Sequence, residues 1–217
     1  MSVVYILYTS FSNPLPKKHY AQYLKILPLN LQEKNFGYVR WQDKHLHLFG
    51  KLMLIKGLRL FGYNMASLEN LKYNEYNRPY LDGDIDFNIS HSGEYVFCAI
   101  AKNLKLGIDI EEIRDINFSD FNGIMSKEQW DFIFSSENCL KAFYKYWTAK
   151  ESIIKADGRG LSISLENIHI KKDYGFYENN QWFLKELNIA KKYCACLATD
   201  KKNIMIDMRS INFDNKN

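Results

Sequence analysis

Two short stretches of this sequence carry charged residues at spacings that could build a metal and phosphate site. The stretch Gly-Ile-Asp-Ile-Glu alternates apolar and acidic residues, which predicts a strand with Asp109 and Glu111 on one face. The stretch Trp-Thr-Ala-Lys-Glu-Ser-Ile-Ile-Lys predicts a helix that places Glu151 and Lys155 one turn apart on one side. If strand and helix meet, three carboxylates supply hard oxygen ligands for a divalent cation, and the lysine lies beside them for phosphate charge. The pattern therefore indicates Mg²⁺-dependent chemistry on a pyrophosphate.

Neither pattern is specific when it is taken alone. An Asp-x-Glu pair on a strand occurs often by chance, and glutamate and lysine four positions apart on a helix are a common surface pair. His91, however, follows a predicted strand and lies between two serines and a glycine, where backbone can approach a phosphate. The helix also ends in a Gly-Arg-Gly turn that begins at Gly158. Together these features make coincidence a poor explanation.

The same residues carry a resemblance to a known family. A Gly-hydrophobic-Asp-hydrophobic-Glu strand followed by a Trp-x-x-Lys-Glu-Ser-x-x-Lys helix resembles the 4′-phosphopantetheinyl transferases of the surfactin-synthetase-activating (Sfp) type. Asp109 and Glu151 lie 42 positions apart, which matches the family's spacing of about forty. A third family-like stretch, Phe-Asn-Ile-Ser-His-Ser-Gly, occupies residues 87–93. The similarity covers roughly residues 76–162.

The resemblance implies transfer of the 4′-phosphopantetheine group of coenzyme A to a serine of an acyl or peptidyl carrier protein, with release of 3′,5′-ADP. It implies that Mg²⁺, with Mn²⁺ as the alternative, is held by Asp109, Glu111 and Glu151. Lys155 would stabilise charge on the leaving group. Glu128, Glu151 or a metal-bound water could serve as the base. Glu128 also lies in the first turn of a predicted helix, where a glutamate simply complements the helix dipole.

The resemblance also implies where coenzyme A binds. His91 would contact the 3′-phosphate, whereas a lysine that the family often carries three residues before Lys34 is Leu31 here. Arg78 stands where the family has lysine, and it keeps the charge while adding a bidentate fork. The full expected coenzyme A set is Lys34, Arg78, Pro79, Ser90, His91, Lys150 and Lys155.

The expected fold is mixed α/β. The resemblance implies two similar α/β halves related by a pseudo-two-fold axis, with the active site in the cleft between them. We place the N-terminal half, with its coenzyme A contacts, at residues 1–105 and the C-terminal half, with its metal and carrier-protein contacts, at residues 106–217. No stretch has the composition of a linker, so the halves should pack as one unit.

Local patterns predict several elements. Ser126 and Gln129 have the spacing of a capping box at a helix start, and the main helix should run from Ser136 to about residue 156. A strand is expected over residues 162–171, and the Asn- and Lys-rich tail after Ile211 should fray. The apolar side chains between residues 113 and 121 could either grip the carrier protein or pack onto the protein's own core.

Composition sets the broad class. The chain has 217 residues, of which 47% are hydrophobic, and a formal net charge of only +4. This excludes a disordered protein, and no run of one charge sign suggests a nucleic-acid arm. The apolar run at residues 3–7 is too short for a membrane span, and the four cysteines lack metal-binding spacing, so we expect a cytoplasmic protein with reduced thiols. The length resembles that of the family's monomeric members.

Two other functions fit part of the pattern. A metal-dependent nucleotide pyrophosphohydrolase would use the same carboxylates with water as nucleophile. A non-catalytic coenzyme A-binding module would show substitutions at the metal ligands, and Asp109, Glu111 and Glu151 show none. A carrier-binding loop and a coenzyme A phosphate site distinguish the transferase from both.

Overall fold

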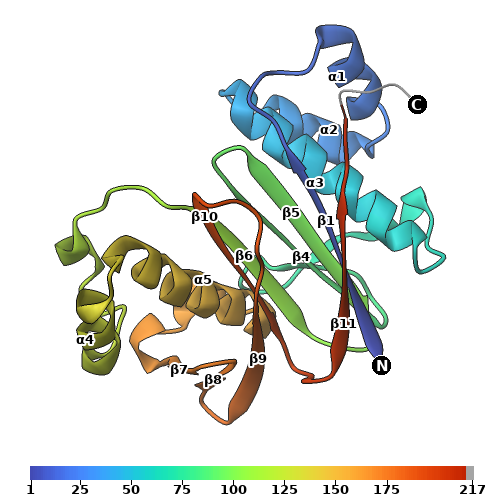
Figure 1. Ribbon diagram of the computed structural model, residues 1–217. Coiled ribbons are helices and arrows are strands. Elements are labelled where there is room, and N and C mark those ends of the chain that lie inside the picture. Colours follow the sequence, from blue (N-terminus) through green and yellow to red (C-terminus); the bar gives the residue numbers. More distant parts are fainter. Residues whose placement is uncertain (214–217) are drawn as a thin grey trace.

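Two β-sheets and two long helices organise the chain, which the computed structural model describes over residues 1–213 (Figure 1). The first part contains β1 (Ser2–Ser10), α1 (Lys17–Leu24), α2 (Leu29–Phe36), α3 (Trp41–Arg59), β2 (Lys72–Tyr73), β3 (Pro79–Tyr80), β4 (Ile85–Ser92) and β5 (Tyr95–Lys102). The second contains β6 (Leu106–Glu112), α4 (Lys127–Ser135), α5 (Cys139–Asp157), β7 (His169–Lys171), β8 (Tyr174–Tyr177), β9 (Asn180–Glu186), β10 (Tyr193–Thr199) and β11 (Ile204–Ser210). The predicted mixed α/β class is confirmed. Residues 214–217 of the tail that we expected to fray lie outside the described residues.

The strands form a four-stranded sheet in the order β11-β1-β5-β4 and a five-stranded sheet in the order β6-β10-β9-β8-β7. The last strand, β11, pairs in parallel with β1, so that Val4 lies opposite Ile206. The C-terminal end therefore returns to the sheet of residues 1–105, which the expected division at residue 106 does not anticipate. This pairing ties the two parts of the chain into one unit.

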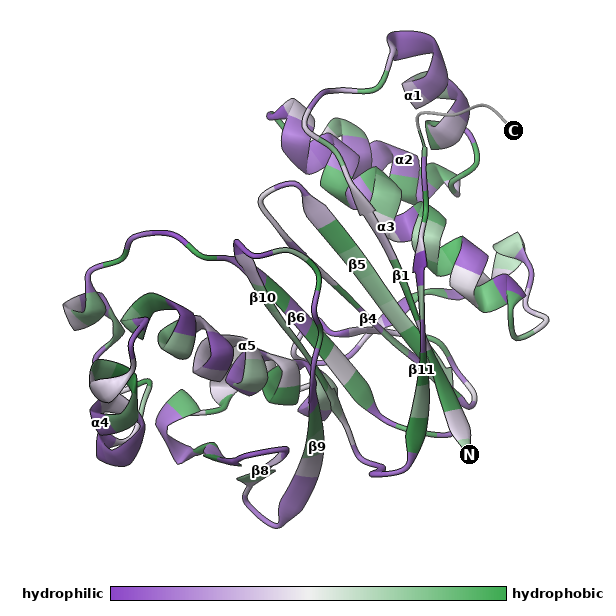
Figure 2. Cartoon of the chain, in the orientation of Figure 1, coloured by the Kyte–Doolittle hydropathy of each residue, from purple (hydrophilic) through white to green (hydrophobic). Residues whose placement is uncertain are grey.

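The molecule is built in four layers. Helix α3 buries residues such as Leu48 and Phe49 against one face of the first sheet, and the opposite face of that sheet packs on the second sheet through Ile6, Ala99 and Ile110, among others. Helix α5 covers the outer face of the second sheet. Hydrophobic residues are accordingly concentrated in the strands of both sheets (Figure 2). No helix within residues 1–213 is both long enough and apolar enough to cross a membrane.

Strands β4 and β6 meet at the edges of the two sheets through side chains. Four polar residues of β4, each two positions from the next, accept hydrogen bonds from backbone N–H groups of β6. The donor and acceptor pairs are Leu106 to Asp86 Oδ2 (2.9 Å), Ile108 to Asn88 Oδ1 (3.0 Å), Ile110 to Ser90 Oγ (3.3 Å) and Glu112 to Ser92 Oγ (3.0 Å). These four bonds form a side-chain ladder. The ladder pairs backbone N–H groups of the edge strand β6 that would otherwise be buried without an acceptor.

The boundaries of α5 differ from the prediction at one end. The helix begins at Cys139 rather than at Ser136, because the side chain of Asn138 accepts a hydrogen bond from the N–H of Lys141. Ser136 instead closes the preceding helix, where its hydroxyl donates to the carbonyl of Phe132. The C-terminal prediction is confirmed, since Gly158 has φ +92° and caps the helix in the left-handed region. The capping box of Ser126 at the start of α4 is also confirmed.

Residues 162–171 do not form the predicted strand. Two single turns of 3₁₀-helix, Gly160–Ser162 and Leu165–Asn167, interrupt the segment, and only His169–Lys171 forms a strand. The N–H of Ile163 bonds to the carbonyl of Gly160, and that of Ile168 bonds to the carbonyl of Leu165. These local bonds satisfy the backbone without a partner strand.

The apolar side chains that follow β6 pack onto the protein itself. Ile113, Ile116, Phe118 and Phe121 are half-buried against a cluster that includes Phe143. Of the two roles considered for them, the structure thus shows packing on the protein's own core. Two exposed aromatic side chains lie nearby on α4, Phe132 and Phe134.

We predict that Asn88→Ala lowers the free energy of unfolding by about 1–3 kcal/mol, because the buried N–H of Ile108 loses its acceptor. Urea unfolding followed by circular dichroism measures the change. Asn180→Ala makes the same substitution at an exposed strand position and should change stability by less than about 0.5 kcal/mol. Equal losses in the two variants would contradict a stabilising role for the ladder.

Candidate active site

Asp109 is the centre of the predicted carboxylate cluster. Its side chain is 3% exposed, and its Oδ1 lies 2.6 Å from Lys155 Nζ and accepts a hydrogen bond from Ser90 Oγ at 3.0 Å. Lys155 Nζ also lies 3.0 Å from Ser90 Oγ. The other carboxylate oxygen, Asp109 Oδ2, is buried and has no hydrogen-bond partner. The contact therefore brings together one residue each from β4, β6 and α5, as the sequence predicted for Asp109 and Lys155.

The close approach of α5 to β6 depends on Gly107. A Cβ atom at this position would lie 2.1 Å from the carbonyl oxygen of Ser152 and 2.4 Å from the backbone nitrogen of Ala156. Only glycine leaves room for the helix backbone at this distance. The glycine that begins the Gly-Ile-Asp-Ile-Glu stretch thus allows Lys155 to reach Asp109.

Glu111 and Glu151 complete the acidic cluster. Glu111 Oε2 accepts a hydrogen bond from Ser92 Oγ at 2.7 Å, and the Trp147 side chain lies close enough to lower the pKa of this carboxyl slightly. Glu151 is close enough to feel the charges of Asp109, Lys155 and Glu111. The structure thus brings together all three carboxylates that the sequence predicted.

Burial and mutual repulsion make these carboxylates harder to ionise. Burial is the main cause that raises the pKa of Asp109, although the Lys155 ammonium opposes it. Burial, followed by the negative charge of Asp109, raises the pKa of both Glu111 and Glu151. Three negative charges in a partly desolvated site are stabilised by nearby positive charge, and the ammonium of Lys155 supplies one such charge.

The carboxylates of Asp109, Glu111 and Glu151 are of the chemical type that binds Mg²⁺, but they are not arranged around a common point where an ion could bind. Hard carboxylate oxygens suit Mg²⁺, and the unpartnered Asp109 Oδ2 is a free ligand atom. The ammonium of Lys155, however, lies against the other oxygen. Across the described residues, no three Asp, Glu, His or Cys side chains are grouped closely enough to hold an ion as they stand. The residues therefore fit a metal in type, and side-chain rearrangement is needed to bind one.

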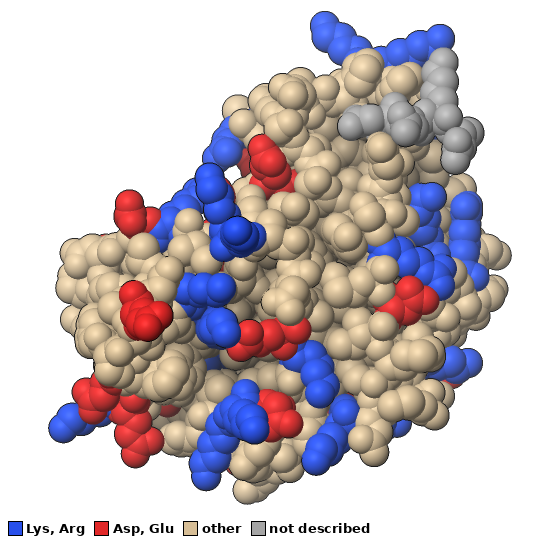
Figure 3. All heavy atoms as spheres, viewed as in Figure 1, with Lys and Arg blue, Asp and Glu red and all other residues tan. Residues whose placement is uncertain are grey.

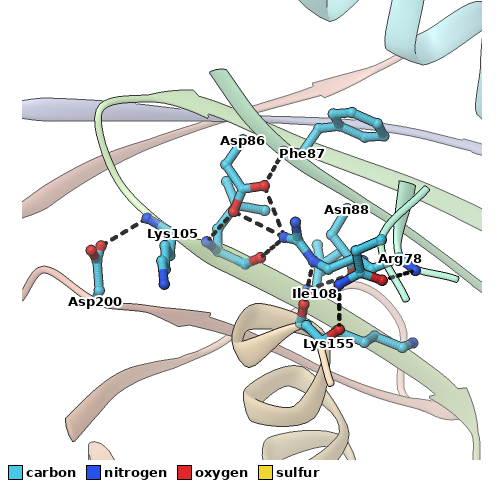
Figure 4. Close-up of polar contacts among 11 residues, drawn as sticks. Arg78, Asp86, Phe87, Asn88, Lys105, Ile108, Lys155 and Asp200 are labelled. Atoms are coloured by element: carbon cyan, nitrogen blue, oxygen red, sulfur yellow. Dashed lines mark hydrogen bonds and ion pairs between the residues drawn. The ribbon is translucent and has the colours of Figure 1, made fainter. Parts of the chain in front are cut away.

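Arg78 connects the two parts of the chain at the end of this site (Figure 4). Its Nε donates to the carbonyl of Lys155 at 2.8 Å, and one terminal nitrogen donates to Asp86 at 2.8 and 2.9 Å and to the carbonyl of Leu106 at 3.1 Å. These partners lie on α5, β4 and β6. The structure thus places Arg78, which we expected to contact coenzyme A, in a clamp that holds the C-terminal end of α5 against β4.

Lys150 and Glu128 lie away from the carboxylates. Lys150 is fully buried, and its Nζ donates to the carbonyls of Ile124 at 2.7 Å and Leu165 at 2.8 Å. It therefore anchors two loops, about 100° around the axis of α5 from Glu151. Glu128 is exposed in the first turn of α4 and is not among the charges that act on Asp109, Glu111 or Glu151.

Two of the remaining predicted residues line a pocket of about 330 Å³ between α3 and β4. His91 and Pro79 line it, together with His47 and Lys51. His91 is exposed at the rim, and partial desolvation there, with the Lys155 ammonium second, lowers its pKa. The nearby Lys34 lies with its ammonium 5.4 Å from the ring centre of Tyr73, and its charge reaches the pocket. Lys and Arg side chains are interspersed with Asp and Glu side chains on the face of the molecule shown in Figure 3.

Sequence reasoning missed several residues of this site. Ser92 and Asn88 belong to an alternating series of short polar side chains on β4, and that alternation was visible in the sequence. Trp147 was predicted only as a motif residue, although its side chain lies close enough to Glu111 to affect the pKa of that carboxyl. Lys51 stands in an apolar stretch of α3, where a single lysine gave no periodic signal.

Comparisons with known proteins agree with this arrangement. Residues 105–198 match the model of the 4′-phosphopantetheinyl transferase superfamily. The chain is 36% identical over 149 residues to the 4′-phosphopantetheinyl transferase gsp of Aneurinibacillus migulanus, which covers 65% of this chain and 62% of the relative. It is 30% identical over 198 residues to a Haemophilus influenzae protein that is provisionally given the same transferase name, covering 85% and 83% of the two chains. It is 28% identical over 163 residues to 4′-phosphopantetheinyl transferase Sfp of Bacillus subtilis, covering 73% and 72%.

We predict that Glu151→Gln stabilises the metal-free protein at neutral pH. The folded state raises the pKa of this carboxyl, so the charged form is disfavoured on folding, and the neutral amide removes that penalty. The gain should disappear as the pH falls below the ordinary glutamate pKa of about 4.3, where the wild-type group is neutral in both states. Melting temperatures measured between pH 3.5 and 8 with EDTA present test this. Glu69→Gln, at an exposed position, should show no such pH dependence, and a gain that persists at pH 3.5 would contradict the electrostatic cause.

We also predict that Arg78→Lys costs about 1–3 kcal/mol of unfolding free energy, because a single ammonium cannot reproduce the guanidinium fork that joins α5, β4 and β6. Urea unfolding measures the loss. Arg40→Lys provides the matched control, since Arg40 is 69% exposed and faces only Asp43 at 3.8 Å. If both variants are as stable as the wild type, the clamp does not stabilise the fold.

Proposed function

This chain belongs to the 4′-phosphopantetheinyl transferase family, and we propose that it carries out the family's reaction with Mg²⁺ held by Asp109, Glu111 and Glu151. As a member of the family it is a transferase with coenzyme A and a carrier protein as its substrates. The reaction moves the 4′-phosphopantetheine group of coenzyme A to a serine of the carrier, releases 3′,5′-ADP and converts the apo carrier to the holo form. The observation that carries the proposal is the gathering of these three carboxylates and Lys155 where β4, β6 and α5 meet.

The bound ion would neutralise the pyrophosphate and act as a Lewis acid on its oxygens. Mn²⁺ is the alternative ion for the same oxygen ligands. Ser90 and Ser92 hold the Asp109 and Glu111 carboxylates by hydrogen bonds from their hydroxyl groups, which orients these ligands from outside.

Lys155 supplies the second positive charge of the site. Its ammonium lies in the carboxylate cluster and can pair with a phosphate oxygen as negative charge develops on the leaving 3′,5′-ADP. The serine oxygen of the carrier forms a bond to the phosphorus that bears the pantetheine, and the bond from that phosphorus to the bridging oxygen breaks. The proton of the serine passes to a base.

Glu151 is the better of the two glutamates considered as that base. Its carboxylate lies in the cluster, and its raised pKa brings it closer to neutral pH, where a general base is most effective. Glu128 is exposed on α4 and outside the cluster. The position of Glu151 within the cluster therefore supports this glutamate over Glu128 as the base.

No observation favours a pyrophosphohydrolase or a non-catalytic binding module over the transferase. The expectations of a monomer and of a cytoplasmic location stay predictions, and light scattering after size-exclusion chromatography tests the former. The carrier could belong to a fatty acid, polyketide or peptide synthetase.

We expect an apo carrier protein that is incubated with this protein, coenzyme A and Mg²⁺ to gain the mass of one phosphopantetheine group, measured by intact mass spectrometry. EDTA should abolish the gain, and Glu151→Ala should reduce the rate at least about 100-fold, because removing a group essential to charge stabilisation typically costs 10²–10³ in rate. Glu128→Ala serves as the control and should retain activity.

The other outcomes have distinct meanings. Cleavage of coenzyme A to 3′,5′-ADP without modification of any carrier would favour the hydrolase. Binding of coenzyme A without cleavage would favour a binding module. Activity of Glu151→Ala equal to that of the wild type would remove this residue from the site.

A further inference from the structure

Tyr193, at the start of β10, contacts the turn that joins β4 to β5, although it belongs to none of the motifs found in the sequence. Its hydroxyl oxygen accepts a hydrogen bond from the backbone N–H of Glu94, a residue of that turn, at 3.3 Å. Its ring packs edge-on against the ring of Tyr95, with 4.8 Å between the ring centres. Strand β10 belongs to the second sheet, whereas β4 and β5 belong to the first. Tyr193 therefore ties this turn to the opposite sheet.

The turn fits against Tyr193 because its first residue, Gly93, has no side chain. Gly93 has φ +54°, which glycine adopts readily at the first position of a two-residue hairpin turn. A Cβ atom at this position would lie 2.4 Å from the Tyr193 hydroxyl oxygen and 2.7 Å from Glu112 Oε2. Arg114 fixes the Glu112 carboxylate, since its Nε donates to the same Oε2 at 3.0 Å. The hydroxyl and the carboxylate thus occupy the space that a side chain would need.

Ser92 is the residue immediately before this turn and the last member of the side-chain ladder. Its Oγ accepts a hydrogen bond from the backbone N–H of Glu112 at 3.0 Å and donates one to Glu111 Oε2 at 2.7 Å. The position of Ser92 therefore sets the orientation of the Glu111 carboxylate. A displacement of the turn would move Ser92 first.

The turn needs a link to the second sheet because β4 is an edge strand of the first sheet. The carbonyl of Glu94 accepts a hydrogen bond from the N–H of Phe11 at 3.0 Å, which holds the turn to the first sheet. The N–H of the same residue bonds to Tyr193 and holds the turn to the second sheet. The two bonds together fix the turn between the sheets, next to the acidic cluster.

We propose that Tyr193 is a positioning residue of the metal site. Its hydroxyl holds the turn after β4, and the turn holds Ser92 in the place where it orients the Glu111 carboxylate for a divalent cation. Tyr193 does not itself bind the ion, and its effect passes through Ser92. This inference rests on the proposed function for the role of Glu111 as a metal ligand.

Amide hydrogen exchange measured by NMR tests the first step without metal or substrate. Tyr193→Phe removes one oxygen atom and releases the turn, so the bond from the Glu112 N–H to Ser92 should open more often. Exchange at Glu112 should become roughly 3- to 10-fold faster, the effect expected for loss of one hydrogen bond. Exchange at Ile108, whose N–H bonds to Asn88 in the same ladder, should not change.

A neighbouring hydroxyl provides the matched control. Tyr95→Phe removes the hydroxyl of the ring that packs on Tyr193 and leaves the Tyr193 hydroxyl in place, so exchange at Glu112 should stay at the wild-type rate. Unchanged exchange at Glu112 in Tyr193→Phe would overturn the proposal. Equal acceleration at Glu112 and Ile108 would overturn it as well, because it would show general loosening of the fold.

Mn²⁺ binding to the protein without coenzyme A or carrier, followed by electron paramagnetic resonance of the free ion, tests the second step. Ser92→Ala should weaken binding about 10- to 100-fold, as is typical for the loss of a group that orients a metal ligand. Tyr193→Phe should weaken it roughly 3- to 10-fold. The double variant should bind no more weakly than Ser92→Ala, because Tyr193 acts through Ser92. Losses that multiply in the double variant would contradict this route.

The two measurements separate this inference from the proposed function. Mn²⁺ binding that Tyr193→Phe leaves unchanged would overturn the inference and leave the proposed function standing. A wild-type protein that neither binds Mn²⁺ nor modifies a carrier would refute the proposed function. Faster exchange at Glu112 alone would in that case still support the link from Tyr193 to Ser92.

Discussion

The two sheets meet at an edge where polar side chains replace backbone carbonyl groups as hydrogen-bond acceptors. Strand β6 cannot leave its N–H groups unpaired in the interior, and β4 supplies an acceptor at every second residue. The spacing is fixed because side chains on one face of a strand recur with a period of two. This constraint sets the register of β4 against β6 and hence the positions of Asp109 and Glu111 relative to Ser90 and Ser92.

The register has a direct chemical consequence. Ser90 and Ser92 each accept a hydrogen bond from β6 and donate one to a carboxylate, so the ladder that joins the sheets also holds Asp109 and Glu111 in place. The same packing buries the carboxylates, which raises their pKa and makes a nearby cation necessary. In the metal-free protein Lys155 supplies part of this positive charge. Asp109 Oδ2, which has no partner among the described residues, remains available to a further cation.

A residue type can match a family pattern and still have other partners in the fold. Arg78 keeps the positive charge of the family position, yet its guanidinium is occupied by Asp86 and by the carbonyls of Lys155 and Leu106. The longer, forked side chain reaches backbone that an ammonium would not bridge. Lys51 illustrates the converse, since a lysine outside any motif lines the pocket beside His91.

The sequence by itself determined the mixed α/β class, the strand with Asp109 and Glu111 and the helix with Glu151 and Lys155, because periodicity and local motifs depend only on neighbouring residues. Helix ends were less certain: Asn138, not Ser136, caps α5, and both can accept the same kind of hydrogen bond. Only the tertiary structure decided that β11 returns to β1, that Lys150 points to backbone carbonyls, that Glu128 is exposed on α4 and that Lys51 lines the pocket beside His91. These outcomes depend on which surfaces are brought together by residues far apart in the chain, and burial and the partners of a charge are properties of that packing rather than of local spacing.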